Sequence, residues 1–199
     1  MITIIDYGVG NLRSAQKGFE RVGHPAIITS DPKEVERASK LVLPGVGAFG
    51  DAMVNLRNSG LISPLLDAAQ RGVSVLGICL GLQIFFEESE EHGLHEGLGL
   101  LPGRVRRFPK GQRIPQIGWN QLHIRRSHPL LEGISDGAFV YFVNSYYVDP
   151  VDPSDTVATT DYGIDFTSVV GREHLFGVQF HPEKSQEVGL RILKNFGGM

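Results

Sequence analysis

The only cysteine of the chain, Cys79, lies in the motif Gly77-Ile-Cys-Leu-Gly81, after an apolar run and before a helical pattern. Small residues two positions away on either side allow the sharp bend of a G-x-nucleophile-x-G elbow, here with cysteine in place of serine. The bend would present the sulfur at the carboxyl edge of a sheet and at a helix N-terminus, which favours a thiolate. A lone cysteine is also often a buried structural residue. The elbow alone leaves both interpretations open.

A second group of reactive side chains, His181-Pro-Glu183, follows the apolar run Leu175–Phe180. Residues two apart in an extended segment point to the same side, and Pro182 disfavours a helical conformation at His181. We therefore expect the imidazole and the carboxylate to face one site. A cysteine, a histidine and an orienting carboxylate form a nucleophile–base–orienter triad. In it, His181 would move protons and Glu183 would hold its tautomer.

A third feature is the glycine-rich segment Leu43-Pro-Gly-Val-Gly47, whose backbone N–H groups could stabilise an oxyanion. The stretch from Gly45 to Gly50 also matches the dinucleotide motif G-x-G-x-x-G, with Asp67 about 20 residues later. The ribose-binding acid should end the next strand, whereas Asp67 falls inside the helical pattern Pro64–Gln70. This context argues against dinucleotide binding.

These motifs must be positioned by an alternation of strands and helices. Short β-branched runs occupy Ile2–Asp6, Ala26–Thr29, Lys40–Leu43 and Val73–Ile78, and helical patterns occupy Asn11–Val22, Phe49–Ala69, Leu80–Ser89 and Gln186–Phe196. Between Gly103 and Gly177 apolar runs, including one at Phe139–Val148, follow one another without long helices. The pattern predicts an α/β fold, a central, mostly parallel sheet flanked by helices, with an antiparallel section in the C-terminal half. No linker divides the chain, so we expect a single domain over residues 1–199.

Composition excludes several classes of function. The chain has 19 basic and 22 acidic residues among 199, a balance without the basic footprint of nucleic-acid or membrane-surface binding. The longest apolar run, Gly72–Phe86, is shorter than the roughly 20 residues of a membrane span, and no signal peptide is visible. One cysteine cannot form an internal disulfide. We therefore expect a cytoplasmic protein with no nucleic-acid or membrane partner. His92 and His95 lack a third ligand, so no metal and no cofactor is predicted.

Taken together, the motifs resemble the class I (triad-type) glutamine amidotransferases over essentially the whole chain. The resemblance is carried by Gly77-Ile-Cys-Leu-Gly-Leu-Gln83, by the Pro-Gly-Val-Gly segment and by Phe180-His-Pro-Glu-Lys-Ser185. Asp6-Tyr-Gly-Val-Gly-Asn11 and Gly118-Trp-Asn120 narrow it to the glutaminase subunits of imidazole glycerol phosphate synthase. Those subunits usually have Pro-His-Met-Gly-Trp-Asn where this chain reads Pro115-Gln-Ile-Gly-Trp-Asn. This departure leaves the details of the docking loop open.

The resemblance implies a flavodoxin-like fold and a set of site residues. The catalytic triad would be Cys79, His181 and Glu183. The oxyanion hole would use the Leu80 amide and an amide of the Gly45–Val46 segment. Side chains or backbone that hold glutamine would be Gly47, Gln83, Glu91, Ser145 and Tyr146. The partner-facing residues would be Asn11, Trp119, Asn120, Tyr141 and Lys184.

The function implied by the resemblance is glutamine hydrolysis to glutamate and ammonia through a thioester at Cys79. The ammonia would pass to a separate (β/α)8-barrel cyclase subunit, which makes imidazole glycerol phosphate and an aminoimidazole carboxamide ribotide in histidine biosynthesis. Three alternatives remain: a glutaminase subunit serving pyridoxal phosphate, anthranilate or aminodeoxychorismate synthesis, a cysteine hydrolase acting alone, and a binding domain with an inert Cys79.

Overall fold

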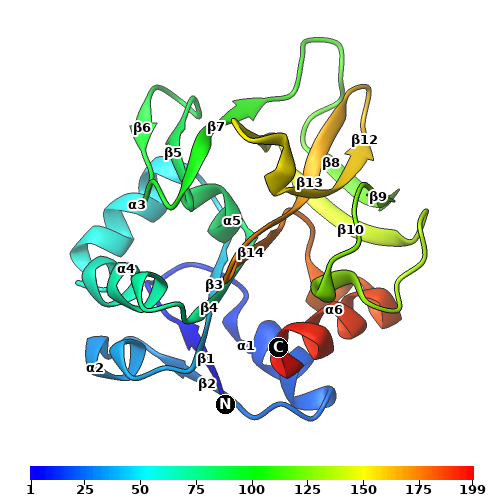
Figure 1. The fold of residues 1–199 in the computed structure, drawn as a ribbon. Helices are drawn as coiled ribbons and strands as arrows, with labels where there is room; N and C mark the ends of the chain where they lie inside the picture. Colours follow the sequence, from blue (N-terminus) through cyan, green and yellow to red (C-terminus); the bar gives the residue numbers. More distant parts are fainter.

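A computed structural model describes residues 1–199 and shows one long twisted sheet at the centre of the molecule (Figure 1). Five parallel strands form one half of this sheet. Their spatial order is β2 (Ala26–Thr29), β1 (Ile2–Ile5), β3 (Lys40–Gly45), β4 (Ser74–Cys79) and β14 (Leu175–Val178). The carboxyl ends of β3 and β4 therefore lie beside the end of β14.

The other half of the sheet is mostly antiparallel. From β14 it continues through β13 (Asp165–Arg172), β11 (Tyr146–Pro150), β7 (Leu101–Arg107), β5 (Phe86–Ser89) and β6 (His95–Glu96). Off this path, β12 (Thr156–Asp161) pairs with β13, and β9 (His123–Ile124) pairs with β12. Only β5 and β7 pair in parallel here. A separate antiparallel pair consists of β8 (Gln116–Gln121) and β10 (Phe139–Asn144). The predicted fold class, with its antiparallel C-terminal section, is confirmed.

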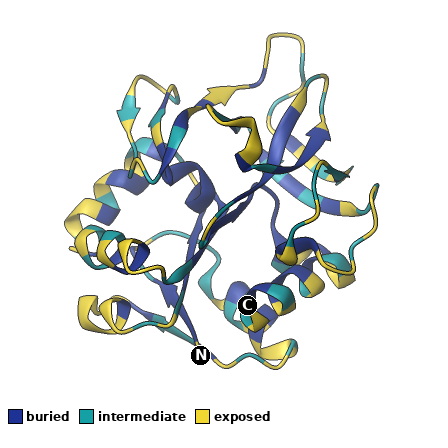
Figure 2. Cartoon of the chain, in the orientation of Figure 1, coloured by how far each residue is buried: buried dark blue, intermediate teal, exposed yellow.

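Helices cover both faces of the parallel half, because alternate strand residues point to opposite sides. Ile4 and Leu76 pack in one core with α1 (Leu12–Arg21) and α6 (Gln186–Gly198). Ile5 and Val75 pack in a second core with α2 (Pro32–Glu36), α3 (Phe49–Asn58) and α4 (Ile62–Gln70). The strands between the two layers are buried along most of their length (Figure 2).

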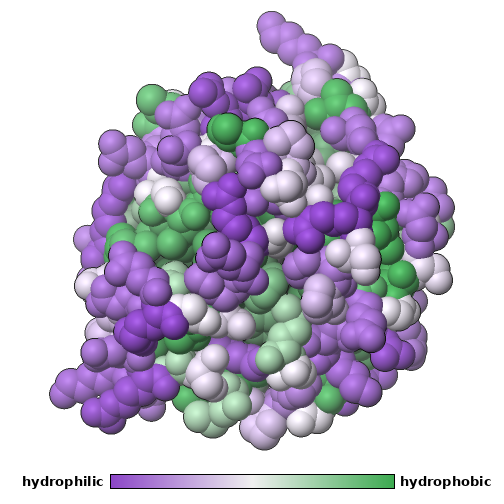
Figure 3. All heavy atoms as spheres, viewed as in Figure 1, coloured by the Kyte–Doolittle hydropathy of each residue, from purple (hydrophilic) through white to green (hydrophobic).

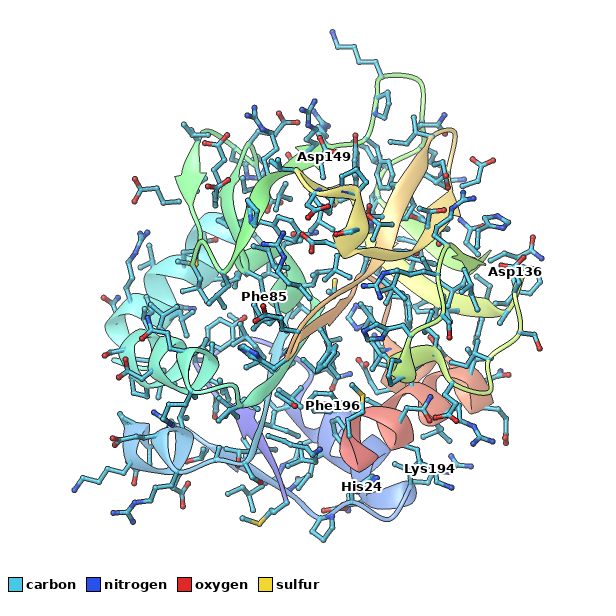
Figure 4. All side chains as sticks on the ribbon, in the orientation of Figure 1. His24, Phe85, Asp136, Asp149, Lys194 and Phe196 are labelled. Carbon is cyan, nitrogen blue, oxygen red and sulfur yellow. The ribbon has the colours of Figure 1, made fainter.

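Side chains at the helix ends complete the two cores. Phe196 projects from α6 towards the sheet, and Phe85 follows α5 (Leu80–Ile84) in the middle of the molecule (Figure 4). Both side chains are fully buried. On the face drawn in Figure 3, hydrophilic residues cover most of the surface and apolar groups form separate patches. Burial of the large apolar side chains is therefore the main contribution that holds helices and sheet together.

Three predicted elements were wrong in extent. The helix expected over Phe49–Ala69 is interrupted between α3 and α4, where Gly60 adopts a positive φ of 72°. The helix expected over Leu80–Ser89 ends at Ile84, and β5 pairs with β7 instead. The strand expected over Phe139–Val148 is divided between β10 and β11, which belong to different sheets. In the last two cases tertiary pairing, which local periodicity does not report, decides the backbone conformation.

The elbow at Cys79 depends on close backbone contact between α5 and the strands beneath it. A Cβ atom at Gly81 would lie 1.7 Å from the Leu43 carbonyl oxygen, and one at Gly77 would lie 2.7 Å from the Leu82 Cα. Both obstacles are backbone atoms, which cannot rotate away. The glycines on either side of Cys79 therefore allow α5 to pack directly on β3 and β4.

Replacing Gly81 with alanine should destabilise the fold by overpacking, at or above the usual range of about 1–3 kcal/mol. The expected result is a lower urea midpoint with little change in the slope of the unfolding curve. Gly198→Ala is the matched control, because a Cβ there meets no atom within 4 Å. Equal midpoints for the two variants would contradict the proposed role of Gly81.

Candidate active site

Cys79 is the last residue of β4 and caps α5 with φ 55° and ψ −112°. A positive φ is rare for a residue with a side chain and costs roughly 1–3 kcal/mol, so the surrounding contacts must hold it. The residue is 6% exposed, and the sulfur lies 3.9 Å from the Val143 carbonyl oxygen and 3.7 Å from Gln179 Nε2. The elbow predicted from the sequence is thus present in the backbone.

His181 and Glu183 meet directly, with 2.9 Å between His181 Nδ1 and Glu183 Oε1. Both side chains are less than 5% exposed. The segment is not extended throughout, as the sequence suggested, because Pro182–Lys184 forms a 3-10 turn. The histidine backbone is fixed on both sides: its N–H donates to the Tyr141 carbonyl at 2.9 Å, and its carbonyl accepts from Ser185 Oγ at 2.7 Å.

The environment of His181 favours its charged form. Burial alone lowers the pKa of the imidazole, but hydrogen bonds to Cys79 and Glu183 outweigh this effect and raise the pKa to about 10. A buried cation requires a nearby negative charge, and the two groups that can supply it are the Glu183 carboxylate and the Cys79 thiolate. The arrangement can therefore support a thiolate–imidazolium pair.

The glycine-rich segment lies alongside Cys79. Gly45 at the end of β3 is the register partner of Cys79, whereas Val46 is 42% exposed and Gly47 has a φ of 97°. Leu80 is the first residue of α5, so its N–H has no partner within the helix. The end of β3 and the start of α5 thus both adjoin Cys79, which is where the sequence predicted the oxyanion-hole amides.

A buried tyrosine that the sequence analysis did not identify supports this loop. Tyr7 donates its hydroxyl to the Pro44 carbonyl oxygen at 2.9 Å. Burial and the negative charge of Cys79 raise the pKa of Tyr7, so the hydroxyl keeps its proton and remains a donor. The available signal in the sequence was only that Tyr7 directly follows the strand expected over Ile2–Asp6.

A cavity of about 250 Å³ opens above the sulfur and brings most of the predicted residues together. It is lined by Val46, Gly47, Cys79, Leu80, Gln83, Glu91, Ser145, Tyr146, His181 and Lys184, with Pro115, Val143 and Asn144. Gly45, Glu183 and Asn11 border a much smaller space on the other side of His181. All predicted catalytic, oxyanion and substrate-binding residues thus lie in one region.

Two of the predicted substrate contacts already have partners within the protein. Gln83 Nε2 donates to the Tyr146 carbonyl oxygen and to Gln179 Oε1, both at 3.1 Å, which leaves its own oxygen as the free acceptor. Glu91 accepts the N–H of Phe49 at 2.7 Å and so anchors the start of α3. Gln179 is a second buried residue that the sequence analysis missed, although it alternates with His181.

Three of the predicted partner-facing residues, Trp119, Asn120 and Tyr141, lie on the β8–β10 pair. Trp119 and Tyr141 are cross-strand partners with ring centroids 5.8 Å apart in an edge-to-face arrangement. Trp119 is 43% exposed, and the neighbouring Ile117 and Phe139 are 62% and 52% exposed. One end of this pair reaches the site, because Pro115, just before β8, and Asn144, the last residue of β10, both line the cavity.

Three further observations concern metal binding, dinucleotide binding and membrane spanning. No group of three or more His, Cys, Asp or Glu side chains is placed to bind a metal ion. His95 instead packs against Gly50 at the start of α3. Asp67 lies within α4, as expected, and not at a strand end where it could contact a ribose. None of the helices has both the length and the apolar character required to cross a membrane.

The raised pKa of His181 makes a prediction about stability and pH. A pKa raised from 6.5 to about 10 stabilises the folded state fully below pH 6.5, and this contribution is lost as the pH rises towards 10. We compare the free energy of unfolding of the native chain with that of His181→Gln. The difference should decrease as the pH rises from 6.5 to 10. Urea unfolding at pH 6, 8 and 10 measures this difference. His24→Gln is the control, because native His24 contacts the Lys194 carbonyl on α6 and lies away from the site. A difference that grows with pH would show that the ring is buried in its neutral form.

Comparison with solved structures identifies the same fold. A crystal structure of a glutamine amidotransferase has a TM-score of 0.78 at 19% identity and covers all of both chains. PurLQS from Thermotoga maritima also has a TM-score of 0.78, at 20% identity, covering 98% of this chain and 96% of that one. At these identities the likeness concerns the fold alone.

Comparison of sequences identifies the family. Residues 3–197 match the family model described as glutamine amidotransferase class-I. The imidazole glycerol phosphate synthase subunit HisH of Syntrophotalea carbinolica is 56% identical, with complete coverage of both chains. The subunit of the same name from Geobacter sulfurreducens is 52% identical, covering all of this chain and 98% of its own. The chain therefore belongs to the class-I glutamine amidotransferase family, within the group formed by the HisH subunits.

Proposed function

We propose that this chain is the glutaminase subunit of an imidazole glycerol phosphate synthase. The observation that carries the proposal is the convergence of Cys79 and His181 at one cavity, with Glu183 bonded to His181, in a chain whose relatives at 52–56% identity are named HisH. These names favour this function over the pyridoxal phosphate, anthranilate and aminodeoxychorismate alternatives. A free thiol of this kind suits the reducing cytoplasm, where we place the reaction.

In the first half-reaction, the Cys79 thiolate attacks the side-chain amide carbon of glutamine. The oxyanion that forms lies within reach of the Leu80 amide and of the loop that contains Gly45 and Val46. His181 is charged at neutral pH and gives its proton to the departing nitrogen, which leaves as ammonia. A glutamyl thioester on Cys79 and a neutral imidazole remain.

In the second half-reaction, His181 takes a proton from water, and the resulting hydroxide attacks the thioester carbon. The carbon–sulfur bond breaks, so glutamate leaves and the thiolate is restored beside a charged imidazole. Glu183 holds Nδ1 throughout and stabilises the cation that recurs in both steps. The sum is glutamine and water converted to glutamate and ammonia.

Substrate recognition uses the remaining groups of the cavity. The Gln83 oxygen has no partner in the protein and can accept an N–H from glutamine. Gly47, Glu91, Ser145 and Tyr146 complete the contacts we assign to glutamine. Because Glu91 also anchors the start of α3, a change of this residue would alter both glutamine binding and the oxyanion loop.

The partner in this proposal is a (β/α)8-barrel cyclase subunit that consumes the ammonia. The exposed Ile117, Trp119 and Phe139 on the β8–β10 pair are the kind of aromatic and aliphatic surface that anchors protein interfaces. Asn11, Asn120, Tyr141 and Lys184 are the polar and aromatic residues we assign to the same contact. This position would place the acceptor next to the point where ammonia forms.

Cys79→Ala should abolish glutamine-dependent synthesis in the complex but leave synthesis from added ammonium salts near the native rate. Removal of the nucleophile stops thioester formation and does not touch the partner's site. Both rates can be measured on the reconstituted complex, with Ser63→Ala on the exposed face of α4 as the control. Glutamine-dependent turnover that survives in Cys79→Ala would disprove the assignment of the nucleophile.

The free chain should hydrolyse glutamine slowly and gain about 10²–10³-fold in kcat when the liganded partner binds. Such a factor corresponds to one oxyanion donor, and the Gly45–Val46 segment can supply it by peptide rotation, because glycines flank Val46 on both sides. A ligand on the partner changes this loop only by favouring one of its states. Steady-state glutaminase rates of the free chain, the complex and the liganded complex test the expectation. Three equal rates would favour a hydrolase that acts alone.

A further inference from the structure

We propose that Gln179 is a thiolate-stabilising residue: its side-chain amide donates a hydrogen bond to Cys79 Sγ and is held in that orientation by Gln83. The inference rests on the proposed function in so far as Cys79 is taken as the nucleophile. Gln179 would thus join the three residues of the triad as a fourth side chain of the site, and it contacts the sulfur directly.

Strand register places Gln179 beside Cys79. The parallel strands β14 and β4 pair Val178 with Ile78, so the next residue of each strand is Gln179 and Cys79 respectively. The Gln179 backbone N–H continues the sheet by donating to the Ser168 carbonyl at 2.9 Å. The residue is completely buried. Its side chain therefore reaches the sulfur from the neighbouring strand, without any loop between them.

The direction of the amide follows from its other contacts. Gln83 Nε2 lies 3.1 Å from the Tyr146 carbonyl oxygen, which can only accept, so this nitrogen must be a donor. The same nitrogen lies 3.1 Å from Gln179, whose atom there must be the oxygen Oε1. The Gln179 amide is then turned so that Nε2, a donor, lies 3.7 Å from Cys79 Sγ. Reversing it would place two donors opposite each other.

The two neutral contacts of the sulfur favour opposite protonation states. The Val143 carbonyl oxygen, at 3.9 Å, can accept the S–H proton and so favours the thiol. The Gln179 N–H is a donor, and a donor binds a negative sulfur more strongly than a neutral one. Together with the charged His181, Gln179 therefore shifts the balance towards the thiolate, which is the reactive form.

The side-chain amide of Gln179 also connects the proposed substrate contact Gln83 to Cys79. Gln83, whose free oxygen we assign to glutamine, donates directly to the residue that contacts the sulfur. A change at Gln83 that frees the Gln179 amide should therefore reduce sulfur reactivity even when no glutamine is present. A residue that served substrate binding alone would not have this effect.

The test is the rate of alkylation of the free chain by iodoacetamide as a function of pH. Cys79 is the only thiol, so all labelling reports on this sulfur. Gln179→Met keeps the length of the side chain and removes the donor; it should move the midpoint of the profile upward by about one pH unit, a tenfold loss of rate well below the midpoint. Gln179→Glu, which places an acceptor against the sulfur, should move the midpoint further in the same direction.

Gln16→Met is the matched control, because Gln16 also uses its amide for a partly buried contact, to the Ala26 carbonyl at 2.8 Å, but on α1. Its profile should coincide with that of the native chain. An unchanged midpoint in Gln179→Met, or a rate reduced by the same factor at every pH, would overturn the proposal, since either would indicate a structural role only. Alkylation requires no glutaminase activity, so these results are independent of the proposed function.

A second measurement covers the case in which the variants do not fold. In the native chain labelled with ¹⁵N at glutamine side chains, the amide resonance of Gln179 should shift with the same midpoint as the alkylation profile. Cys79→Ala should remove this transition. The absence of any glutamine side-chain resonance that titrates with the thiol would overturn the proposal.

Discussion

The parallel pairing of β4 with β3 on one side and with β14 on the other is the constraint on which the site depends. It aligns Gly45, Cys79 and Gln179 at one edge of the sheet, from segments more than 30 residues apart in the chain. The hydrogen bonds of the ladder set this alignment, so it needs no flexible contact to maintain it. His181 lies two residues after Gln179, so the same strand also determines where the histidine is placed.

The second organising contact joins His181, the proposed catalytic base, to the exposed aromatic surface. The Tyr141 carbonyl on β10 accepts the His181 N–H, and the Tyr141 side chain packs on Trp119. One residue therefore belongs to the proposed partner surface and also fixes the backbone of the base. Because β10 hydrogen-bonds along its length to β8, a displacement of this pair would be felt at His181 through a single hydrogen bond.

Much of this arrangement could be predicted from the sequence, because glycine and strand-end patterns are local. The elbow at Cys79 follows from the spacing of its glycines, and the parallel half of the sheet follows from strands alternating with helices. The proximity of His181 and Glu183 was expected from an extended segment, whereas a 3-10 turn at Pro182–Lys184 brings them together. Tyr7 and Gln179 were missed because their roles come from strands that are neighbours only in the folded sheet. The strand at Phe86–Ser89 was predicted as helix for the same reason, since β7 that stabilises it begins at Leu101.

The hydrogen bond from Tyr7 to the Pro44 carbonyl has a mechanical consequence for the glycine-rich loop. It anchors the Pro44–Gly45 peptide to the buried side chain of Tyr7, and the Glu91 carboxylate anchors the N–H of Phe49 at the start of α3. With both ends anchored, sliding of the loop along the sheet or lifting of the loop as a flap would break one of these two hydrogen bonds. The motion left to it is a crankshaft rotation of the few peptides between the anchors, which reverses the direction of an N–H group while the chain path hardly changes.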